Sequence, residues 1–226
     1  MKQLSEYINE KLVLNKDTFK KRAGYKYYPS SKQELINIIT KIIKNEKDDT
    51  KVIDLNDIDT SEITDMCELF SSIDIVKKIK KIDISQWDVS NVRKMKDMFY
   101  WCENLESTGD LSLWDVSNVT SMINMFGNCY NLYDIGDLSS WRVSNVENMS
   151  GMFKNDENLE YIGDISSWKV TKLAAINNMF YRCEKLRDIG DLDKWTNNKI
   201  VYMGGAFSSA AFKLLKNIKI PSWYDA

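Results

Sequence analysis

The amino-acid sequence predicts an α/β solenoid of about six stacked units, each 27 residues long. A degenerate first unit, in which Met66 and Phe70 match Met95 and Phe99, aligns at an offset of 29 residues. A fixed period of about 20–29 residues is typical of leucine-rich repeats, whose units must stack because none buries its apolar face alone. Two aromatic series carry the 27-residue period: Trp87, Trp114, Trp141, Trp168 and Trp195, and Phe99, Phe126, Phe153, Phe180 and Phe207.

Each unit is predicted to hold one short helix and one short strand. In residues 117–129 a capping Ser117 or Asn118 precedes apolar residues at helical spacing. The next segment, residues 132–141, has leucine-rich spacing and contains Gly136, which breaks the helix. We therefore expect strands to form a parallel sheet on one face and short helices to line the other. The apolar stripe of the helix consists of Val119, Met122, Met125, Phe126 and Cys129.

The ends of the array are predicted to be covered by caps. We divide the chain into an N-terminal helical leader and cap (1–50), the leucine-rich-repeat solenoid (51–207) and a C-terminal cap (208–226). Residues 31–45 begin with a capping Ser31 and continue at helical spacing, as expected of a helix that covers the first strand at 51–55. At the other end Pro221 closes a final short strand at 218–220.

Composition argues against an enzyme. The chain has 226 residues, a formal net charge of −2 and no histidine. Without histidine, the common catalytic triads and the commonest zinc ligand are excluded. The sequence also lacks a phosphate-binding glycine loop and a CxxC pair. A hydrolase with paired carboxylates is the remaining enzymatic hypothesis, but every recurring aspartate recurs because the repeat does. We expect no cofactor, no metal, and no nucleic-acid or membrane partner.

Two runs carry a family resemblance. Residues 87–99 (WDVSNVRKMKDMF) and 114–126 (WDVSNVTSMINMF) resemble the BspA-type leucine-rich repeat of bacterial surface proteins, also known as a mycoplasma lipoprotein-associated repeat of unknown function. The resemblance extends over about residues 50–207, and the lead-in 54–70 resembles a first repeat of such arrays. It implies the solenoid fold and a binding role. The charged N-terminus does not resemble a secretion signal, so a cytoplasmic location is expected.

The first ten residues support a second hypothesis. They resemble the capsid-targeting leaders of tailed-phage internal proteins, with Ile8-Asn9-Glu10 as the processing site. This resemblance implies a structural or packaged component of a phage particle, located in the virion or the infected cell. The alternative is an ordinary amphipathic helix with Leu4, Tyr7, Ile8 and Leu12 on one side.

The candidate binding residues lie on the predicted strand face. Each aspartate of a recurring series precedes an inward Ile or Leu, so its side chain should point out of the sheet. Such a ladder of like charges is favourable when each carboxylate gains local hydrogen bonds, or when the strip binds Ca²⁺ or a basic partner. Positions that vary between units lie beside it. We predict a basic protein partner bound by Tyr133, Tyr161, Glu106, Glu160, Asp110, Asp137 and Asp164.

Other recurring residues are predicted to be structural. The tryptophans could form a ligand-stacking row, but one per unit in fixed register favours the core. Cys102, Cys129 and Cys183 share a position with Asp156. They are interpreted as small apolar filler, with a disulfide between adjacent units as the alternative. On the helix side, the outer residues are expected to form no aromatic cluster: Lys94, Lys96, Asn124 and Asn148.

Overall fold

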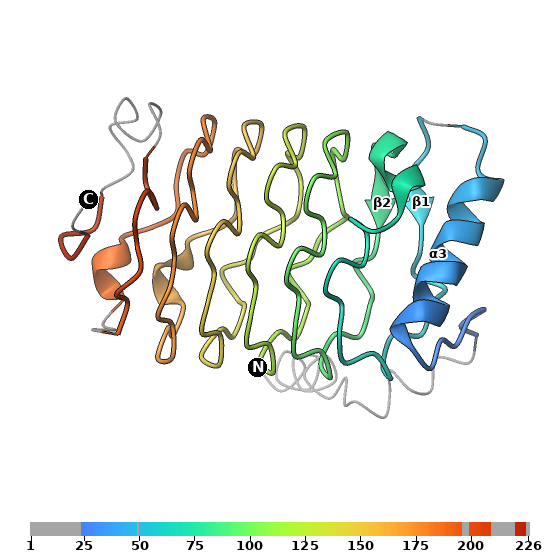
Figure 1. Cartoon of the computed structure of the whole chain (residues 1–226), viewed down its shortest axis with the longest axis horizontal. Helices are drawn as coiled ribbons and strands as arrows, with labels where there is room; N and C mark the ends of the chain where they lie inside the picture. Colours follow the sequence, from blue (N-terminus) through green and yellow to red (C-terminus); the bar gives the residue numbers. More distant parts are fainter. Residues whose placement is uncertain (1–23, 49, 196–198, 209–219, 225–226) are drawn as a thin grey trace, which may run out of the picture.

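A computed structural model describes residues 24–48, 50–195, 199–208 and 220–224. Successive units form coils that lie side by side along the long axis of the molecule, with the α-helix α3 (Lys32–Asn45) at one end (Figure 1). The predicted leader, including Ile8–Glu10, lies outside the described residues, as does most of the region assigned to the C-terminal cap. Over the described part of the chain, no helix combines the length and apolarity needed to cross a membrane.

The helix predicted from Ser31 is present. The Ser31 hydroxyl caps its first turn by accepting a hydrogen bond from the Glu34 amide at 3.3 Å. Leu35, Ile39 and Ile43 are buried at the spacing of one helical face and belong to the same hydrophobic core as the coils. The helix therefore covers the apolar end of the first coils.

The remaining regular elements are short. Strand β1 (Ile53–Asp54) pairs in parallel with β2 (Ile82–Asp83). Short 3-10 helices follow at η1 (Asp74–Lys78), η2 (Ile165–Ser167) and η3 (Leu192–Lys194). Elsewhere the coils are joined by isolated parallel bridges. We use "column" for the residues that share one position in successive coils.

One face of the coils, the strand face, consists of residues 105–110 and the columns they begin. Its parallel pairing includes β1 with β2 and the bridges Ser107 to Asp134 and Tyr161 to Asp188. Backbone bonds continue across neighbouring coils, as from the Thr108 amide to the Asp134 carbonyl at 3.2 Å. The sequence predicted a parallel sheet on this face. In the structure the parallel pairing is present but very short.

The second face, the methionine face, consists of residues 94–101 and their columns. Alternate backbone amides donate hydrogen bonds to backbone carbonyls of the next coil. The pairs are Met95 to Ser121 (3.0 Å), Asp97 to Ile123 (2.8 Å) and Phe99 to Met125 (2.8 Å). A continuous series of parallel bridges crosses this face, through Asp65, Lys94, Ser121, Asn148, Ala175 and Tyr202. The backbone hydrogen bonds of this segment thus run between coils, whereas those of an α-helix run along the chain.

Over the described residues, this face forms turns in place of the short helix expected in each unit. The turns are consecutive, such as those closed by bonds from the Met98 amide to Met95 and from the Cys102 amide to Phe99. The third residue of each turn has a positive φ, at Asp97 (56°) and Trp101 (62°). A succession of three- and four-residue turns gives the same apolar spacing as a helix. The third position of the first turn forms a column in which Asn and Gly tolerate the positive φ: Glu68, Asp97, Asn124, Gly151, Asn178 and Gly205.

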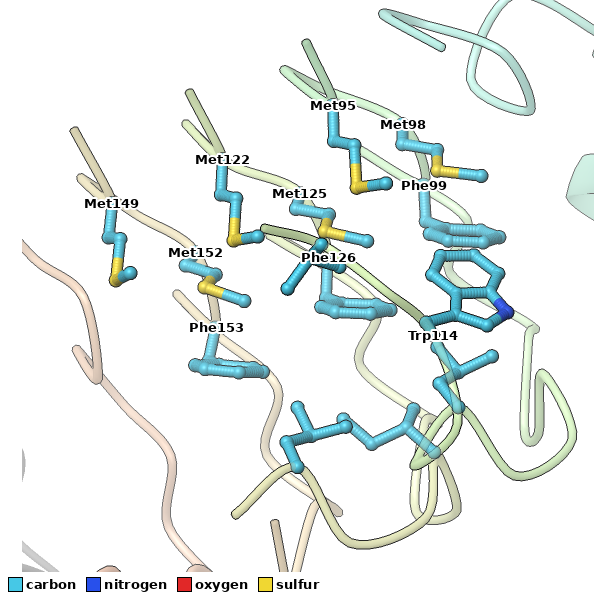
Figure 2. Close-up of a cluster of buried hydrophobic side chains, with 14 of the residues drawn as sticks. Met95, Met98, Phe99, Trp114, Met122, Met125, Phe126, Met149, Met152 and Phe153 are labelled. Carbon is cyan, nitrogen blue, oxygen red and sulfur yellow. The ribbon is translucent and has the colours of Figure 1, made fainter. Parts of the chain in front are cut away.

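Aromatic columns fill the interior between the faces. Phenylalanine rings stack from coil to coil, with centroids 5.3 Å apart for Phe99 and Phe126 and 5.7 Å apart for Phe126 and Phe153 (Figure 2). Trp141 stacks on Trp168 at 6.5 Å. Each repeat tryptophan is only 3% exposed. The prediction that the tryptophans belong to the core is confirmed.

Every repeat tryptophan also ties its coil to the preceding one. The Trp141 indole Nε1 donates to the Leu111 carbonyl at 2.9 Å, and the Trp168 Nε1 donates to the Leu138 carbonyl at 2.9 Å. Near the C-terminus, Trp223 stacks on Trp195 and donates to the Leu192 carbonyl at 3.0 Å. These bonds satisfy carbonyl groups that are otherwise costly to bury.

The cysteine column is buried, and its thiols form no disulfide among the described residues. The thiols of Cys129 and Cys183 lie 3.1 and 2.9 Å from the carbonyls of Phe99 and Phe153. Asp156 stands in the same column with no exposed surface. Its Oδ1 accepts from the Cys129 amide at 3.0 Å, while Oδ2 has no hydrogen-bond partner among the described residues. Burial raises the pKa of Asp156 well above its usual value.

Replacing Trp141 with alanine should lower the free energy of unfolding by about 3–5 kcal/mol. The change removes a stacked ring and leaves the Leu111 carbonyl without its donor. Urea unfolding followed by circular dichroism measures this loss. Leu113→Ala is the control because Leu113 is 86% exposed, and it should change stability by less than about 0.5 kcal/mol. Equal stability of the Trp141 variant and the unmodified chain would contradict the core assignment.

Asp156→Cys should stabilise the protein by about 1–3 kcal/mol at neutral pH, because it removes an unsatisfied buried oxygen. The Cys129 amide keeps its bond to the Phe126 carbonyl. The folded carboxyl holds its proton to higher pH than the unfolded one, so rising pH favours unfolding of the unmodified chain above about pH 4. The gain should therefore grow between pH 4 and pH 8 in denaturation series. Glu147→Gln, at an exposed carboxylate, should show no such growth, and a pH-independent gain for Asp156→Cys would refute the explanation.

Candidate partner-binding face

The structure places the predicted binding residues on the outer surface of the strand face. Tyr133 and Tyr161 are 46% and 53% exposed. Buried Leu132, Ile135 and Ile162 anchor the backbone on either side of them. The remaining predicted residues are exposed or half-buried: Glu106, Asp110, Asp137, Glu160 and Asp164.

Tyr161 is held among carboxylates. Its hydroxyl donates to Asp137 Oδ2 at 2.9 Å. This bond, together with the charges of Asp137, Asp188 and Asp164, raises the pKa of Tyr161. Hydrogen bonds from Ser139 and Tyr161 lower the pKa of Asp137. At neutral pH the exposed ring therefore stands in a negatively charged setting, with its hydroxyl oriented by the neighbouring coil.

Tyr133 has a different environment. Its hydroxyl, followed by Glu106, raises the pKa of Lys81. The Glu106 carboxylate lies 3.9 Å from Lys80 Nζ and 3.8 Å from Lys81 Nζ. The surroundings of Tyr133 are consequently mixed in charge, unlike those of Tyr161.

Sequence reasoning missed Lys80 and Lys81 because the first unit is out of the 27-residue register. The available signal was their position immediately before the apolar Ile82. Glu106 and Ser107 likewise precede a buried residue in the next coil. The predicted Glu160 is also paired, with Arg187 at 3.0 Å. The negative part of the face therefore centres on Tyr161, Asp137 and Asp164, while Glu106 and Glu160 are ion-paired.

The aspartate ladder satisfies its carboxylates locally. Each aspartate accepts a hydrogen bond from the amide two residues later, for example Asp110 from Ser112 and Asp164 from Ser166, both at 2.9 Å. Such bonds form the Asx-turns that aspartate favours. The same geometry holds at Asp54, Asp83, Asp137 and Asp191.

Glycine in the next coil makes room for this ladder. Gly163 has φ +86°, and a Cβ added there would collide with the Asp137 carboxylate. Gly136 and Gly190 meet Asp110 and Asp164 in the same way. A local backbone role therefore accounts for the recurrence of the aspartates. Among the described residues, no three Cys, Asp or Glu side chains gather closely enough to hold a metal ion.

The methionine face carries an aromatic cluster that contradicts the expectation for this side. Trp101, 43% exposed, makes edge contacts with Tyr100 at 6.0 Å and Tyr130 at 6.1 Å between ring centroids. The aromatic residues were overlooked because helical geometry assigned them no common surface, whereas the turns bring them together.

Comparison with known proteins gives one family. The model described as "Mycoplasma protein of unknown function, DUF285" matches residues 39–137 and, in a second overlapping copy, residues 109–223. The two matches together include the strand face, the methionine face and the second half of α3. No curated protein matches the chain.

Millimolar Ca²⁺ is expected to leave the melting temperature nearly unchanged, since the ladder carboxylates are committed to backbone amides. A specific ion would stabilise the fold by RT ln(1 + [L]/Kd), about 2.7 kcal/mol at a hundredfold excess over Kd. Differential scanning calorimetry with and without 5 mM Ca²⁺ makes the comparison, with Mg²⁺ as the control ion. For a weak extracellular-type site this concentration is about a 5- to 50-fold excess over Kd, which corresponds to about 1–2 kcal/mol. A rise of many degrees with Ca²⁺ that is lost in Asp137→Asn would show that the ladder binds metal.

Proposed function

The chain belongs to the family described as Mycoplasma protein of unknown function, DUF285, and we propose that it is a non-enzymatic protein-binding module. In this proposal the chain is a leucine-rich-repeat solenoid of the BspA type that uses its strand face for recognition. The observation that carries it is the fixed, exposed Tyr161 ring among ionised carboxylates.

A rigid support favours recognition by this face. Inter-coil backbone bonds and buried columns hold the outward residues in place, so little conformational entropy is lost when a partner binds. Tyrosine adds large contact area with few rotatable bonds. The Tyr161 hydroxyl is further restrained by Asp137. The face is thus organised before any partner arrives.

Charge indicates the nature of the partner. Asp137, Asp164 and Asp188 surround Tyr161 and would repel nucleic-acid phosphates and anionic lipid surfaces. They would attract lysine and arginine side chains, and the attraction would accelerate association at low salt. A basic protein surface with room for two tyrosines is the partner that this face fits.

Replacing both Tyr133 and Tyr161 with alanine should abolish capture of the partner while leaving the fold intact, because both rings are exposed and no core contact is lost. Affinity capture from a lysate of the source organism, followed by mass spectrometry, provides the measurement. Bound proteins that depend on the tyrosines should also be released as salt increases from about 50 to 500 mM, since exposed charges are screened over that range.

The matched control is charge reversal on the opposite surface, with Lys94→Glu and Lys96→Glu. Both lysines are exposed on the methionine face, so this variant should retain the partner. Circular dichroism checks that every variant is folded. Loss of capture in the lysine variant alone would place the binding face on the other side, and capture that is equal in all variants would reject the proposal.

A further inference from the structure

A shallow hollow opens on the methionine face at the first two coils. Its lining combines two aromatic rings, two carboxylates and two hydroxyls: Tyr100, Trp101, Glu68, Asp97, Ser71 and Ser72. It is separate from the strand face, because the backbone amides of Glu68 and Asp97 take part in the hydrogen bonds that join coils on the methionine face.

Trp101 differs from the repeat tryptophans in its setting. The repeat tryptophans are buried, but Trp101 is 43% exposed. Its backbone has φ 62°, a conformation that costs free energy for a bulky side chain. In the following coils the same position holds Asn128, Asn155 and Arg182. Asparagine would suit this turn better than tryptophan, so the exposed ring is explained more readily by recognition than by folding.

The two carboxylates occupy one column in adjacent coils. Glu68 and Asp97 both have positive φ, at positions where the next coils carry Asn124 and Gly151. Asp97 receives a bond from Asn124 Nδ2 at 2.9 Å and lies 3.5 Å from Lys96 Nζ. The Glu68 side chain is exposed. Because Lys96 already pairs with Asp97, the exposed Glu68 is the carboxylate whose charge a bound cation would chiefly neutralise.

We propose that this hollow receives the guanidinium group of an arginine side chain from a protein partner. A planar guanidinium stacks on an indole face and is attracted by its quadrupole. Glu68 and Asp97 supply charge-assisted hydrogen-bond acceptors beside that face. The carboxylates would repel a phosphate, and their charge attracts a cation more strongly than a neutral sugar, which would gain hydrogen bonds alone. The inference rests on the protein-binding function proposed above, but it names a different site and can be tested without the natural partner.

The test follows the indole N–H signal of Trp101 by NMR in the full chain, after assignment with a Trp101→Phe variant. Titration with N-acetyl-arginine amide should shift this signal in a saturable way. N-acetyl-citrulline amide has nearly the same shape without the charge and should leave the signal in place. The combined variant Glu68→Gln with Asp97→Asn should weaken arginine binding about tenfold. It keeps the Trp101 signal, and Asn124 shows that asparagine fits the Asp97 turn.

The assignment would be overturned by an equal shift with the citrulline derivative, by unchanged affinity in the folded Glu68→Gln/Asp97→Asn variant, or by no shift at any arginine concentration. A shift with cellobiose in place of the arginine derivative would indicate a sugar site and would also reject it. Failure here leaves the capture experiment with Tyr133 and Tyr161 unaffected, so the two proposals can fail separately.

Discussion

The inter-coil backbone hydrogen bond is the interaction on which the rest of this structure depends. Within one coil the chain has too few regular elements to satisfy its own amides and carbonyls. The Met95 amide finds the Ser121 carbonyl, and the Met122 amide repeats the contact with Asn148. Because these bonds set the spacing and register of neighbouring coils, identical side chains come to lie over one another. Stacked aromatic columns, carboxylate ladders and exposed columns are all consequences of that register.

The sequence predicts the parts of the fold that follow from periodicity. A 27-residue repeat with one tryptophan and one phenylalanine per unit is sufficient to identify the core columns, and all of these residues are buried. The capping Ser31 likewise identifies the start of α3. The local backbone was harder to predict, because helical spacing and successive turns place apolar residues at similar intervals. Asn124 and Gly151 distinguish the two, since they recur where positive φ is required.

The candidate face was only partly predictable for an electrostatic reason. Repetition identifies which residues point outward, but the charge that a partner meets also depends on neighbours outside the regular repeats. Lys80 and Lys81 pair with Glu106 although they precede the clear 27-residue register. Conversely, the hydroxyl bond from Tyr161 to Asp137 links two columns and two coils at once. Such a contact becomes visible only when the coils are placed beside each other.

The bond from each tryptophan to the preceding coil makes every interface between coils nearly the same. The Trp141 indole meets the Leu111 carbonyl just as the Trp168 indole meets Leu138, and Trp223 supplies the equivalent donor near the C-terminus. An interior coil therefore presents matching surfaces before and behind it. A gene could gain or lose a whole unit of 27 residues and leave the remaining junctions between coils in register. The length of the proposed recognition surface can thus evolve in discrete steps while the two ends stay the same.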